Sequence, residues 1–515
     1  MNCAAGSVPL CKAANLVRNG FASRHDRASL SRPKPVRLIR QLSMRRDRLV
    51  ALVVAVALFM ENLDSTVIGT SLPAIAADLG TSPLTLKLAV TSYLLSLAVF
   101  IPMSGFAADR FGGRRVFCIA IAVFVLGSIG CALSRSLADF VVARIVQGMG
   151  GAMMTPVGRL VLIRTVDKRA LIDVMAWVSM PALVGPVMGP PLGGFITTFA
   201  SWHWIFLINV PMGLIGILLA ARFLEGGPVV ERVRFDLVGM ALAGAGVAGL
   251  AFGLSVAGLH DLPASVVAGL VIGGASAMLA YLLRARRVPA SVLDFSLLAL
   301  PTFRASLLGG FLFRIGVGAL PFLLPLMMQL GFKLDPFQSG LVTFSAALGA
   351  LTMKAVAARI LQHFGFRTVL VVNALVSACF IAACAAFSQA TPFAFIVSIL
   401  LIGGFFRSLQ FTSINAIAYA EIRPERMSRA TTLAAVGQQL SLSTGVALSA
   451  AVVEFVVHQR ASSVIGIADF RAAFLLVAAV SASSVLLFMQ LPGDAGADLS
   501  HHRQKQRDRL DQAAR

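Results

Sequence analysis

Between Val174 and Ala221 the chain reads VMAWVSMPALVGPVMGPPLGGFITTFASWHWIFLINVPMGLIGILLAA, and these 48 residues include no Lys, Arg, Asp or Glu. A second stretch without these residues runs for 39 positions, from Thr368 to Phe406. Helices this apolar have no polar face to present to water, whereas the interior of a bilayer requires none. The sequence therefore predicts a protein that crosses a membrane several times.

The composition of the whole chain supports this prediction. Of its 515 residues, 57% are hydrophobic and 13% are charged, against about 25% charged in an ordinary soluble domain. The formal net charge is +21, but residues 1–48 alone contribute eleven Lys or Arg against two Asp, and most other basic residues lie in short loops. Since no basic stretch is interleaved with aromatic residues, this charge indicates membrane orientation rather than nucleic-acid binding.

The number of spans follows from the apolar runs. A helix needs about 20 apolar residues to cross a bilayer, and charges, prolines and glycine turns divide the chain into 14 such runs. They are 49–69, 86–106, 116–134, 139–162, 174–199, 205–224, 236–258, 264–283, 304–330, 338–358, 367–388, 392–419, 430–457 and 470–491. We therefore expect an all-α membrane protein with 14 transmembrane helices; counts of twelve or thirteen remain open.

The orientation follows from the loops. With the N-terminus inside, the inner loops carry 18 Lys or Arg and the outer loops carry five. Because basic residues concentrate on the cytoplasmic side, we expect both termini in the cytoplasm and the chain in a bacterial inner membrane.

Several classes of enzyme are disfavoured. The sequence has no phosphate-binding Gly-x4-Gly-Lys-Ser/Thr motif, no His-Glu-x-x-His and no Gly-x-Ser-x-Gly, so we expect neither ATP hydrolysis nor an intramembrane hydrolase. The six cysteines form no Cys-x-x-Cys pair, and four of them lie in apolar runs, which indicates buried packing rather than metal binding. We expect no enzymatic activity, no metal and no cofactor.

Ionisable residues at membrane depth are costly and are functional candidates by default. Glu61 and Asp64 lie three residues apart in the first span, on one helix face. A carboxylate there should face the bundle interior, where low dielectric favours its protonated form, as a proton-binding site requires. The alternative is a permanently paired carboxylate that only positions the helix.

The loop between spans 2 and 3 has the most specific spacing. It reads Gly105-Phe-Ala-Ala-Asp109-Arg110-Phe-Gly112-Gly113-Arg114-Arg115. The glycines permit a tight turn, and the carboxylate is placed to pair with a basic residue or a helix N-terminus. We interpret this cluster as a cytoplasmic latch between helices, with ordinary inner-loop charge as the alternative.

Spans 4 and 5 carry two further motifs. Span 4 contains Arg144 and Gln147 followed by Gly148, and a guanidinium this deep needs a partner such as Glu61 or Asp64. Span 5 repeats small residues and prolines at three- and four-residue spacing, which predicts a thin, kinkable helix that approaches its neighbours closely. Its key positions are Gly185, Pro186, Gly189, Pro190 and Gly193. The alternative is a tightly packed helix without a role in transport.

These motifs resemble signatures of the major facilitator superfamily: the Asp109–Arg114 loop, the Arg144–Gly148 helix and the Gly-Pro helix. With Leu63-Asp64-Ser-Thr66 and the Ser201–Pro211 segment, they look like its fourteen-span drug:proton antiporter branch. The resemblance implies proton coupling at Asp64 and Arg144, an inner gate at Asp109, Arg110 and Arg114, and antiport through the Gly-Pro helix. The double proline Pro190-Pro191 departs from the family pattern, so the bend of that helix is not assumed to be standard.

The fold implied by the resemblance is two six-helix bundles with two extra helices between them. We accordingly divide the chain into a basic disordered extension over 1–48, a first bundle over 49–224, a linker with helices 7 and 8 over 225–290, a second bundle over 291–491 and a cytoplasmic tail over 492–515. Residues 1–43 also have the Arg- and Ser-rich composition of a transit peptide, and Met44 is an alternative natural start.

The second half repeats part of the first. Arg407 and Gln410 in span 12 repeat the Arg-x-x-Gln spacing of Arg144 and Gln147, as expected for two related halves around a midplane site. When Arg314 is included, the guanidiniums within the spans are at least as numerous as the carboxylates. We therefore expect the protein to export neutral or anionic compounds at least as readily as cationic drugs. The candidate residues of the substrate cavity are Gln147, Arg314, Arg407 and Gln410. Internal pairing of Arg314 and Arg407 is the alternative.

The leading hypothesis is a proton-driven exporter of small organic compounds by alternating access. The second is an organic-anion or metabolite transporter of the same fold, and the third is a membrane scaffold or sensor that transports nothing. The expected partners are the lipid bilayer, a small organic substrate and H⁺, with a periplasmic adaptor protein as a further candidate.

Overall fold

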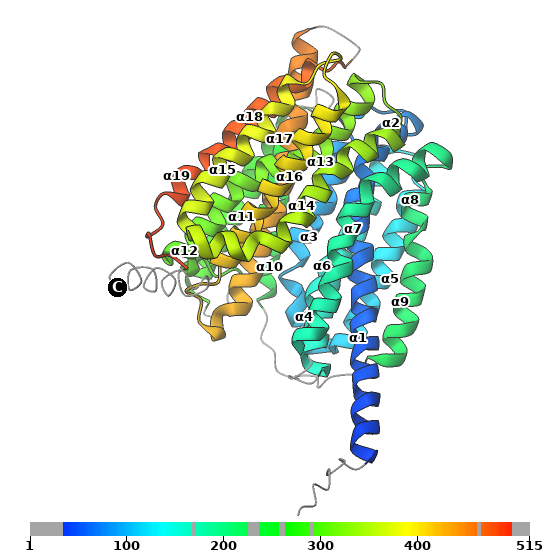
Figure 1. Cartoon of the computed structure of the whole chain (residues 1–515), viewed down its shortest axis with the longest axis vertical. Coiled ribbons are helices and arrows are strands. Elements are labelled where there is room, and N and C mark those ends of the chain that lie inside the picture. The colour runs from blue at the N-terminus through cyan, green and yellow to red at the C-terminus, as the bar shows by residue number, and fades with distance from the viewer. Residues whose placement is uncertain are drawn as a thin grey trace, which may run out of the picture. The chain divides into compact units, whose positions relative to one another are not determined.

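The computed structural model describes residues 34–166, 171–224, 236–256, 263–288, 292–460 and 465–496, and within these ranges the chain is helical without a β-strand (Figure 1). Residues 46–515 form one compact unit, and residues 1–45 form another. The extension expected to be disordered overlaps the first helix, which begins at Lys34. Arg, Leu, Gln and Met in that stretch are good helix formers, which accounts for the earlier start. Residues 1–33 and the tail beyond residue 496 lie outside the described residues.

The first half of the compact unit contains one helix or helix pair for each of the first six predicted spans. Their bounds are α1 Lys34–Val67, η1 Ile68–Ser71, α2 Leu72–Asp78, α3 Lys87–Phe100, α4 Met103–Phe111, α5 Gly113–Ala132, α6 Leu137–Thr165, α7 Leu171–Phe199, α8 Trp204–Leu207 and α9 Asn209–Phe223.

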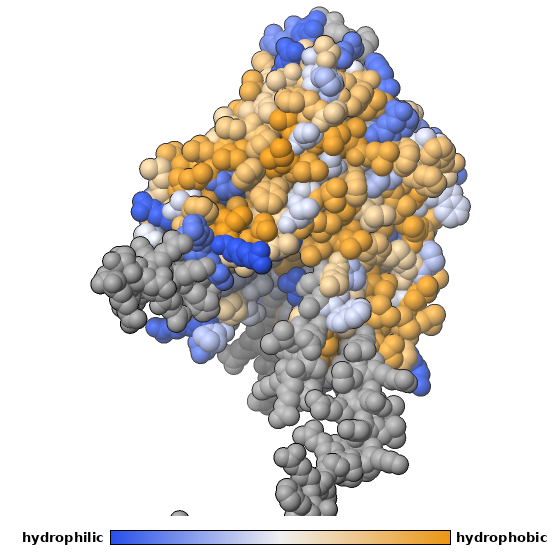
Figure 2. Space-filling model, in the orientation of Figure 1, coloured by the Kyte–Doolittle hydropathy of each residue, from blue (hydrophilic) through white to orange (hydrophobic). Residues whose placement is uncertain are grey.

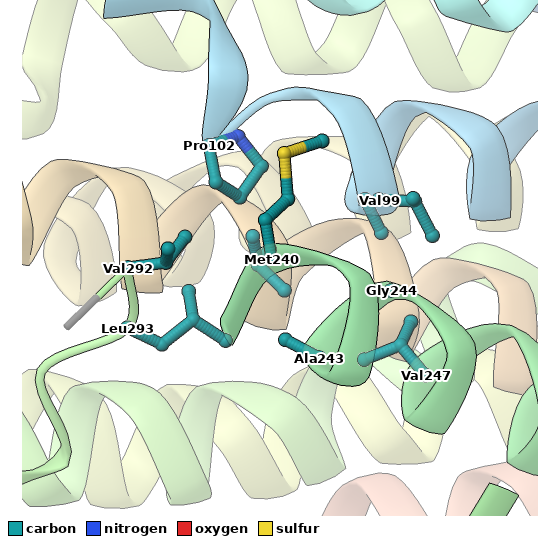
Figure 3. A pocket seen from close by; sticks show the side chains of 10 residues that line it. Val99, Pro102, Met240, Ala243, Gly244, Val247, Val292 and Leu293 are labelled. Carbon is teal, nitrogen blue, oxygen red and sulfur yellow. The ribbon is translucent and has the colours of Figure 1, made fainter. Parts of the chain in front are cut away.

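Two helices follow in the region predicted as a linker, α10 Leu237–Val256 and α11 Ala264–Ala285. They pack against each other, and α10 also contacts α3 of the first half and α17 of the second. Figure 3 shows a small apolar pocket at this junction, where Val99 and Pro102 of the α3 region face Met240 and Gly244 of α10. The inserted pair therefore bridges the two halves.

The second half supplies helices for the last six predicted spans. Their bounds are η2 Phe295–Ala299, α12 Pro301–Arg304, η3 Ala305–Gly309, α13 Gly310–Leu326, η4 Met327–Gly331, α14 Pro336–Phe364, α15 Phe366–Ala383, η5 Cys384–Ala386, α16 Phe393–Ile417, η6 Pro424–Arg426, α17 Met427–Gln459, α18 Asp469–Ser483 and α19 Val485–Phe488.

Each of the 14 predicted runs thus coincides with helix. Within the described residues, 11 helices are long and apolar enough to cross a membrane, or 12 if the pair α3 and α4, bent by 55°, is one span. Leu237–Gly253 of α10 is a shorter apolar helix, and α7 contains four prolines. The all-α fold is confirmed, and the count of 14 spans stays a prediction.

Two helix boundaries follow from local backbone chemistry. Gly112 separates α4 from α5 with φ of 87°, and Gly365 separates α14 from α15 with φ of 74°. Both angles lie where side chains clash with the backbone, so glycine is favoured at these turns. At the other end of α14, Asp335 and Gln338 form a capping box that satisfies the free N–H groups of the first turn. These features fix where the long helices begin and end.

The outer surface of the bundle is apolar. Figure 2 shows hydrophobic residues over most of the visible helices, with hydrophilic residues gathered toward their ends. Large side chains such as Leu126, Trp177 and Leu218 are more than 60% exposed. In water such a surface would be unfavourable, whereas lipid chains solvate it.

The two halves meet mainly through α3 with α17 and through α7 with α14. Lys87 Nζ, which is fully buried, donates to Glu454 Oε2 at 2.8 Å, and Gln329 Nε2 donates to the Thr70 carbonyl at 2.9 Å. Phe195 of α7 packs edge-on against Phe337 of α14 with centroids 5.9 Å apart. These polar and aromatic contacts lie toward the predicted outer ends of their helices, while apolar residues of both halves also meet nearer the inner ends, where Ala98 and Val436 line one pocket.

Candidate functional site

A buried carboxylate lies at the centre of the first half. Asp64 of α1 is 1% exposed and accepts three side-chain hydrogen bonds. Arg144 Nη1 donates to Asp64 Oδ2 at 2.9 Å, while Gln147 Nε2 and Asn209 Nδ2 donate to Oδ1 at 2.7 and 2.9 Å. The donors come from α6 and α9, so one carboxylate links three helices. We call these four residues, together with Ser128, the Asp64 network.

Ser128 of α5 completes this network. Its Oγ accepts from Gln147 Nε2 at 2.7 Å and from Asn209 Nδ2 at 3.1 Å. Gln147 Oε1 also accepts from Arg144 Nη1 at 2.6 Å. The network therefore spans α1, α5, α6 and α9, and any change in the charge of Asp64 alters contacts among all four helices.

Arg144 is enclosed as completely as its partner. It is 1% exposed, its Cζ lies 4.2 Å from the centroid of the Tyr93 ring, and its Nε donates to the Ala89 carbonyl at 3.5 Å. A buried guanidinium is tolerated where a carboxylate and further acceptors compensate it. Both Glu61 and Asp64 were candidate partners from the sequence, and the structure pairs Arg144 with Asp64.

Glu61 lies one turn before Asp64 and has a different environment. Its Oε2 accepts a hydrogen bond from Thr155 Oγ1 of α6 at 2.7 Å, and the residue is partly exposed. Among the described residues it makes no ion pair. The two carboxylates on one face of α1 are thus distinct: one is held by a guanidinium, and the other by a neutral hydroxyl.

The glycines of the Gly-Pro helix face α1. A Cβ on Gly185 would lie 3.1 Å from the carbonyl of Phe59, and a Cβ on Gly189 or Gly193 would collide with Thr66 or Val67. Despite Pro186, Pro190 and the other prolines, α7 runs without interruption from Leu171 to Phe199. The small residues therefore allow α7 to lie directly against the helix that carries Asp64.

The predicted latch loop pairs with α6. Asp109 Oδ1 accepts from Arg164 Nη2 at 2.7 Å, which joins the end of α4 to the end of α6. Arg114 lies in the first turn of α5, and Gly112 makes the turn before it. The acid therefore finds its basic partner on another helix of the same half. Gly105 has open space where a Cβ would stand.

A second ion-pair cluster lies at the same predicted end of the second half. Arg426 Nη2 donates to Asp294 Oδ2 at 2.7 Å, and Arg429 Nη1 lies 3.6 Å from the same oxygen. Burial alone would raise the pKa of Asp294, but hydrogen bonds from Arg426 and Ser296 outweigh it and hold the pKa below its usual value. The carboxylate therefore stays charged at neutral pH and ties the segment before α12 to α17.

The candidate residues of the second half do not form a copy of the Asp64 network. Gln410 of α16 donates to the Leu370 carbonyl and accepts from Asn373 Nδ2, both at 2.9 Å, which ties α16 to α15. Arg407 is 9% exposed and lies against Gly403. Arg314 Nη2 donates to Asn415 Oδ1 at 2.8 Å, and Arg314 Nε has no partner. Neither arginine forms an ion pair with a described residue.

Sequence reasoning missed Asn209, Ser128 and the pairing of Lys87 with Glu454. Asn209 stood inside a quoted motif without a role, and Ser128 is one of many small hydroxyl residues in apolar runs. The available signal was polar side chains at span depth, but their mutual position depends on helix rotation, which the sequence does not reveal.

The comparisons with known proteins now place this arrangement in a family. The family model described as Major Facilitator Superfamily matches residues 54–235 and 306–510. The chain belongs to the major facilitator superfamily. The segment between the two matches contains α10 and α11, the helices inserted between the two halves.

Relatives and solved structures support this placement. The chain is 37% identical over 464 residues to the "Putative multidrug resistance protein MdtD" of Salmonella typhimurium, covering 88% of this chain and 97% of the relative, and equally so to that of Salmonella paratyphi B. The fold is similar to the inward-open xylose transporter XylE from E. coli, with a TM-score of 0.58, 12% identity and coverage of 86% and 96% of the two chains. The human organic anion transporter MFSD10 matches with a TM-score of 0.54, 16% identity and coverage of 86% and 99%. This superfamily protein is thus a membrane transporter in fold and in sequence.

Proposed function

We propose that this transporter exports small organic compounds in exchange for protons, by alternating access between its two halves. The observation that carries the proposal is the Asp64 network, in which a buried carboxylate of α1 is held by a guanidinium and two amides from α6 and α9. Such a group costs free energy in a membrane, and it is a functional candidate for that reason. The name of the Salmonella relatives supports a substrate class of small organic compounds.

The proton step follows from the partners of the two carboxylates. In this conformation Asp64 accepts hydrogen bonds from three N–H donors, one of them the Arg144 guanidinium. A proton on Asp64 would cancel its attraction to Arg144 and release the guanidinium toward another acceptor, which alters the contact between α1 and α6. Glu61, which forms no ion pair among the described residues and accepts a hydrogen bond from the neutral Thr155 hydroxyl, is the natural second position for the proton.

The coupling to movement follows from the place of α1. Its continuation η1 contacts α7, α13 and α14, so the helix that carries Asp64 leads directly into the joint between the halves. A charge change at Asp64 is therefore transmitted to the contact that must open and close. A potential of 100 mV adds about 2.3 kcal/mol for each charge moved, which is enough to sustain uphill export.

The second candidate function is transport of organic anions by the same fold, as symporter or exporter. It is favoured by Arg314, a buried guanidinium without a carboxylate partner in the described part of the chain. A scaffold or sensor without transport is the third candidate, and the fully buried charges of the Asp64 network argue against it.

We place the chain in a bacterial inner membrane with both termini in the cytoplasm, because the predicted inner loops carry most of the basic residues. On this placement the loop with Asp109 forms the inner gate. H⁺ and a small organic compound are the partners in transport, and a periplasmic adaptor protein remains a candidate on the outer side.

Inverted membrane vesicles test the proposal. The vesicles are energised by respiration and loaded with a pH-sensitive dye, and carboxyfluorescein or ethidium is added outside. Antiport predicts release of protons from the lumen when either compound is transported. Uptake of protons together with the compound would support symport, and an absence of flux with a broad panel of compounds would support a scaffold.

Asp64→Asn should abolish the proton release, because the amide cannot exchange a proton. Asp335→Asn is the matched control: it removes one carboxylate from an N-cap outside the network, and Asn caps helices as well as Asp does. An Asp64→Asn protein that is correctly inserted and still accumulates the compound against its gradient at the parental rate would overturn the proposal.

A further inference from the structure

Arg314 presents a buried charge that the proposed proton step does not use. It lies in the second turn of α13 and is 3% exposed. Among the described residues its guanidinium forms one hydrogen bond, from Nη2 to Asn415 Oδ1 at 2.8 Å, and Nε has no hydrogen-bond partner. Buried guanidiniums are normally paired with carboxylates, because an uncompensated charge is expensive at low dielectric.

The contrast with Arg144 shows what is missing. Arg144 is equally buried, and it has a carboxylate at 2.9 Å, an amide oxygen at 2.6 Å and an aromatic ring at 4.2 Å. Arg314 has the amide oxygen and the ring, since its Cζ lies 5.1 Å from the centroid of Phe411, but no described carboxylate. Its environment is therefore that of Arg144 without the anion.

A second cation approaches the same turn of α16. Lys354 of α14 donates from Nζ to Thr412 Oγ1 at 3.2 Å. Phe411, Thr412 and Asn415 are partly exposed and Lys354 is exposed, so this region is open on one side. We call Arg314, Lys354, Phe411, Thr412 and Asn415 the basic cluster.

The helices that build the basic cluster cannot neutralise it themselves. Helices α13, α14, α15 and α16 contain no Asp or Glu. The one acid within the predicted spans of the second half, Glu454 of α17, is taken by Lys87. The first half has the opposite arrangement. There, the first helix of the bundle carries a carboxylate that faces the fourth, because Glu61 of α1 accepts a hydrogen bond from Thr155 of α6.

We propose that the basic cluster binds the carboxylate of a small aromatic organic anion, and that compounds of this class are exported by the protein. The Arg314 guanidinium holds the carboxylate, Lys354 adds a second positive charge on the open side, and Phe411 contacts the apolar body of the compound. The proposal rests on the transport function proposed above and specifies its substrate class.

The chemistry of the cluster fits this ligand. A guanidinium presents two parallel N–H groups that match the two oxygens of a carboxylate, and the pair gains strength in a site shielded from water. An anion there offsets the cost of burying Arg314, whereas an organic cation would meet two like charges. The N–H group at Nε, which has no acceptor among the described residues, supplies one donor, and the terminal Nη groups supply the others.

Binding of matched probes to the purified full-length protein tests the proposal. The probes are 1-naphthoate and 1-naphthylmethylammonium, which share one ring system and differ in charge, and their affinities are measured by titration calorimetry in lipid nanodiscs. We expect the wild-type protein to bind naphthoate at least about tenfold more tightly. Arg314→Gln should weaken naphthoate binding by about tenfold or more and leave binding of the cation within about twofold.

Three further variants make the result specific. Arg304→Gln removes an exposed arginine from the neighbouring α12 and should leave both affinities unchanged. Lys354→Gln should weaken naphthoate binding less than Arg314→Gln does. Arg314→Lys keeps a charge without the planar fork, so its affinity should lie between those of the wild type and the glutamine variant.

The proposal is overturned if the wild type fails to bind naphthoate at millimolar concentration, if it prefers the cation, or if Arg314→Gln weakens both probes equally. The measurement needs no proton gradient, so its outcome is separate from that of the vesicle assay. Selective naphthoate binding together with an absence of proton release would contradict the antiport mechanism, while the assignment of the basic cluster as an anion site would stand.

Discussion

At the scale of single residues, the two buried arginines differ in what their removal leaves behind. Removing Arg144 would leave Asp64 buried with its two amide donors and no counter-charge. Removing Arg314 would leave only Asn415 without its donor. The same substitution therefore has opposite electrostatic consequences at the two positions.

We accordingly predict that Arg144→Gln destabilises the protein strongly, by about 3–5 kcal/mol, because it strands a buried charge. Arg314→Gln should leave stability unchanged or raise it, since it removes a charge that has no described counter-ion. Thermal unfolding midpoints of the purified variants in one detergent provide the measurement. The double variant Asp64→Asn with Arg144→Gln should recover much of the lost stability. Equal destabilisation by Arg144→Gln and Arg314→Gln would contradict the prediction.

The residues of the site were only partly predictable from the sequence. The rarity of charge in apolar runs was enough to single out Asp64, Arg144 and Arg314. The choice of Asp64 over Glu61 as the partner of Arg144 depends on the rotation of α1 about its axis, because the two carboxylates are only about 60° apart around a helix with 3.6 residues per turn. Asn209 and Ser128 reach the same oxygens from helices whose packing no local pattern specifies.

At the scale of elements, α7 shows how glycine spacing sets a helix contact. Its glycines allow the backbone to lie against α1, and Gly340 of α14 gives similar room beside Pro190. The sequence predicted a thin, kinkable helix, and α7 is continuous through all four of its prolines. In membranes, neighbouring helices and local adjustments supply the hydrogen bonds that a proline removes, so proline is a weaker breaker there than in water.

We predict that Gly189→Leu separates α7 from α1 and costs about 1–3 kcal/mol through overpacking, because its side chain would collide with Thr66. Gly273→Leu on α11 is the matched control, since open space surrounds the position of its Cβ. The fraction of each variant that stays monodisperse after heating in detergent measures the effect. Equal losses for the two variants would show that the small residues of α7 are not required for this contact.

At the scale of the whole molecule, the described hydrogen bonds and ion pairs between the halves gather at the predicted outer end. Neither this joint nor its polar members could be predicted from the sequence, since Lys87 and Glu454 are 367 residues apart and each lies near a loop. Family resemblance predicted two bundles with an inserted pair of helices. Which bundle faces come together in a given state is a property of packing between distant helices, and only the three-dimensional structure displays it.

The ion pair between Lys87 and Glu454 should therefore favour the state in which the outer ends are closed. Glu454→Gln leaves the fully buried ammonium of Lys87 without its counter-charge, and such a loss penalises the closed state more than an open state in which water reaches the lysine. We expect the population to shift toward the outer-open state by about tenfold, or about 1.4 kcal/mol.

Spin labels on Ser82→Cys and Gln459→Cys, both exposed at this end of different halves, report the shift as a longer distance by double electron–electron resonance in a background without native cysteines. The charge-reversed pair Lys87→Glu with Glu454→Lys should restore the short distance, and an unchanged distance distribution in Glu454→Gln would show that the pair does not hold the halves together.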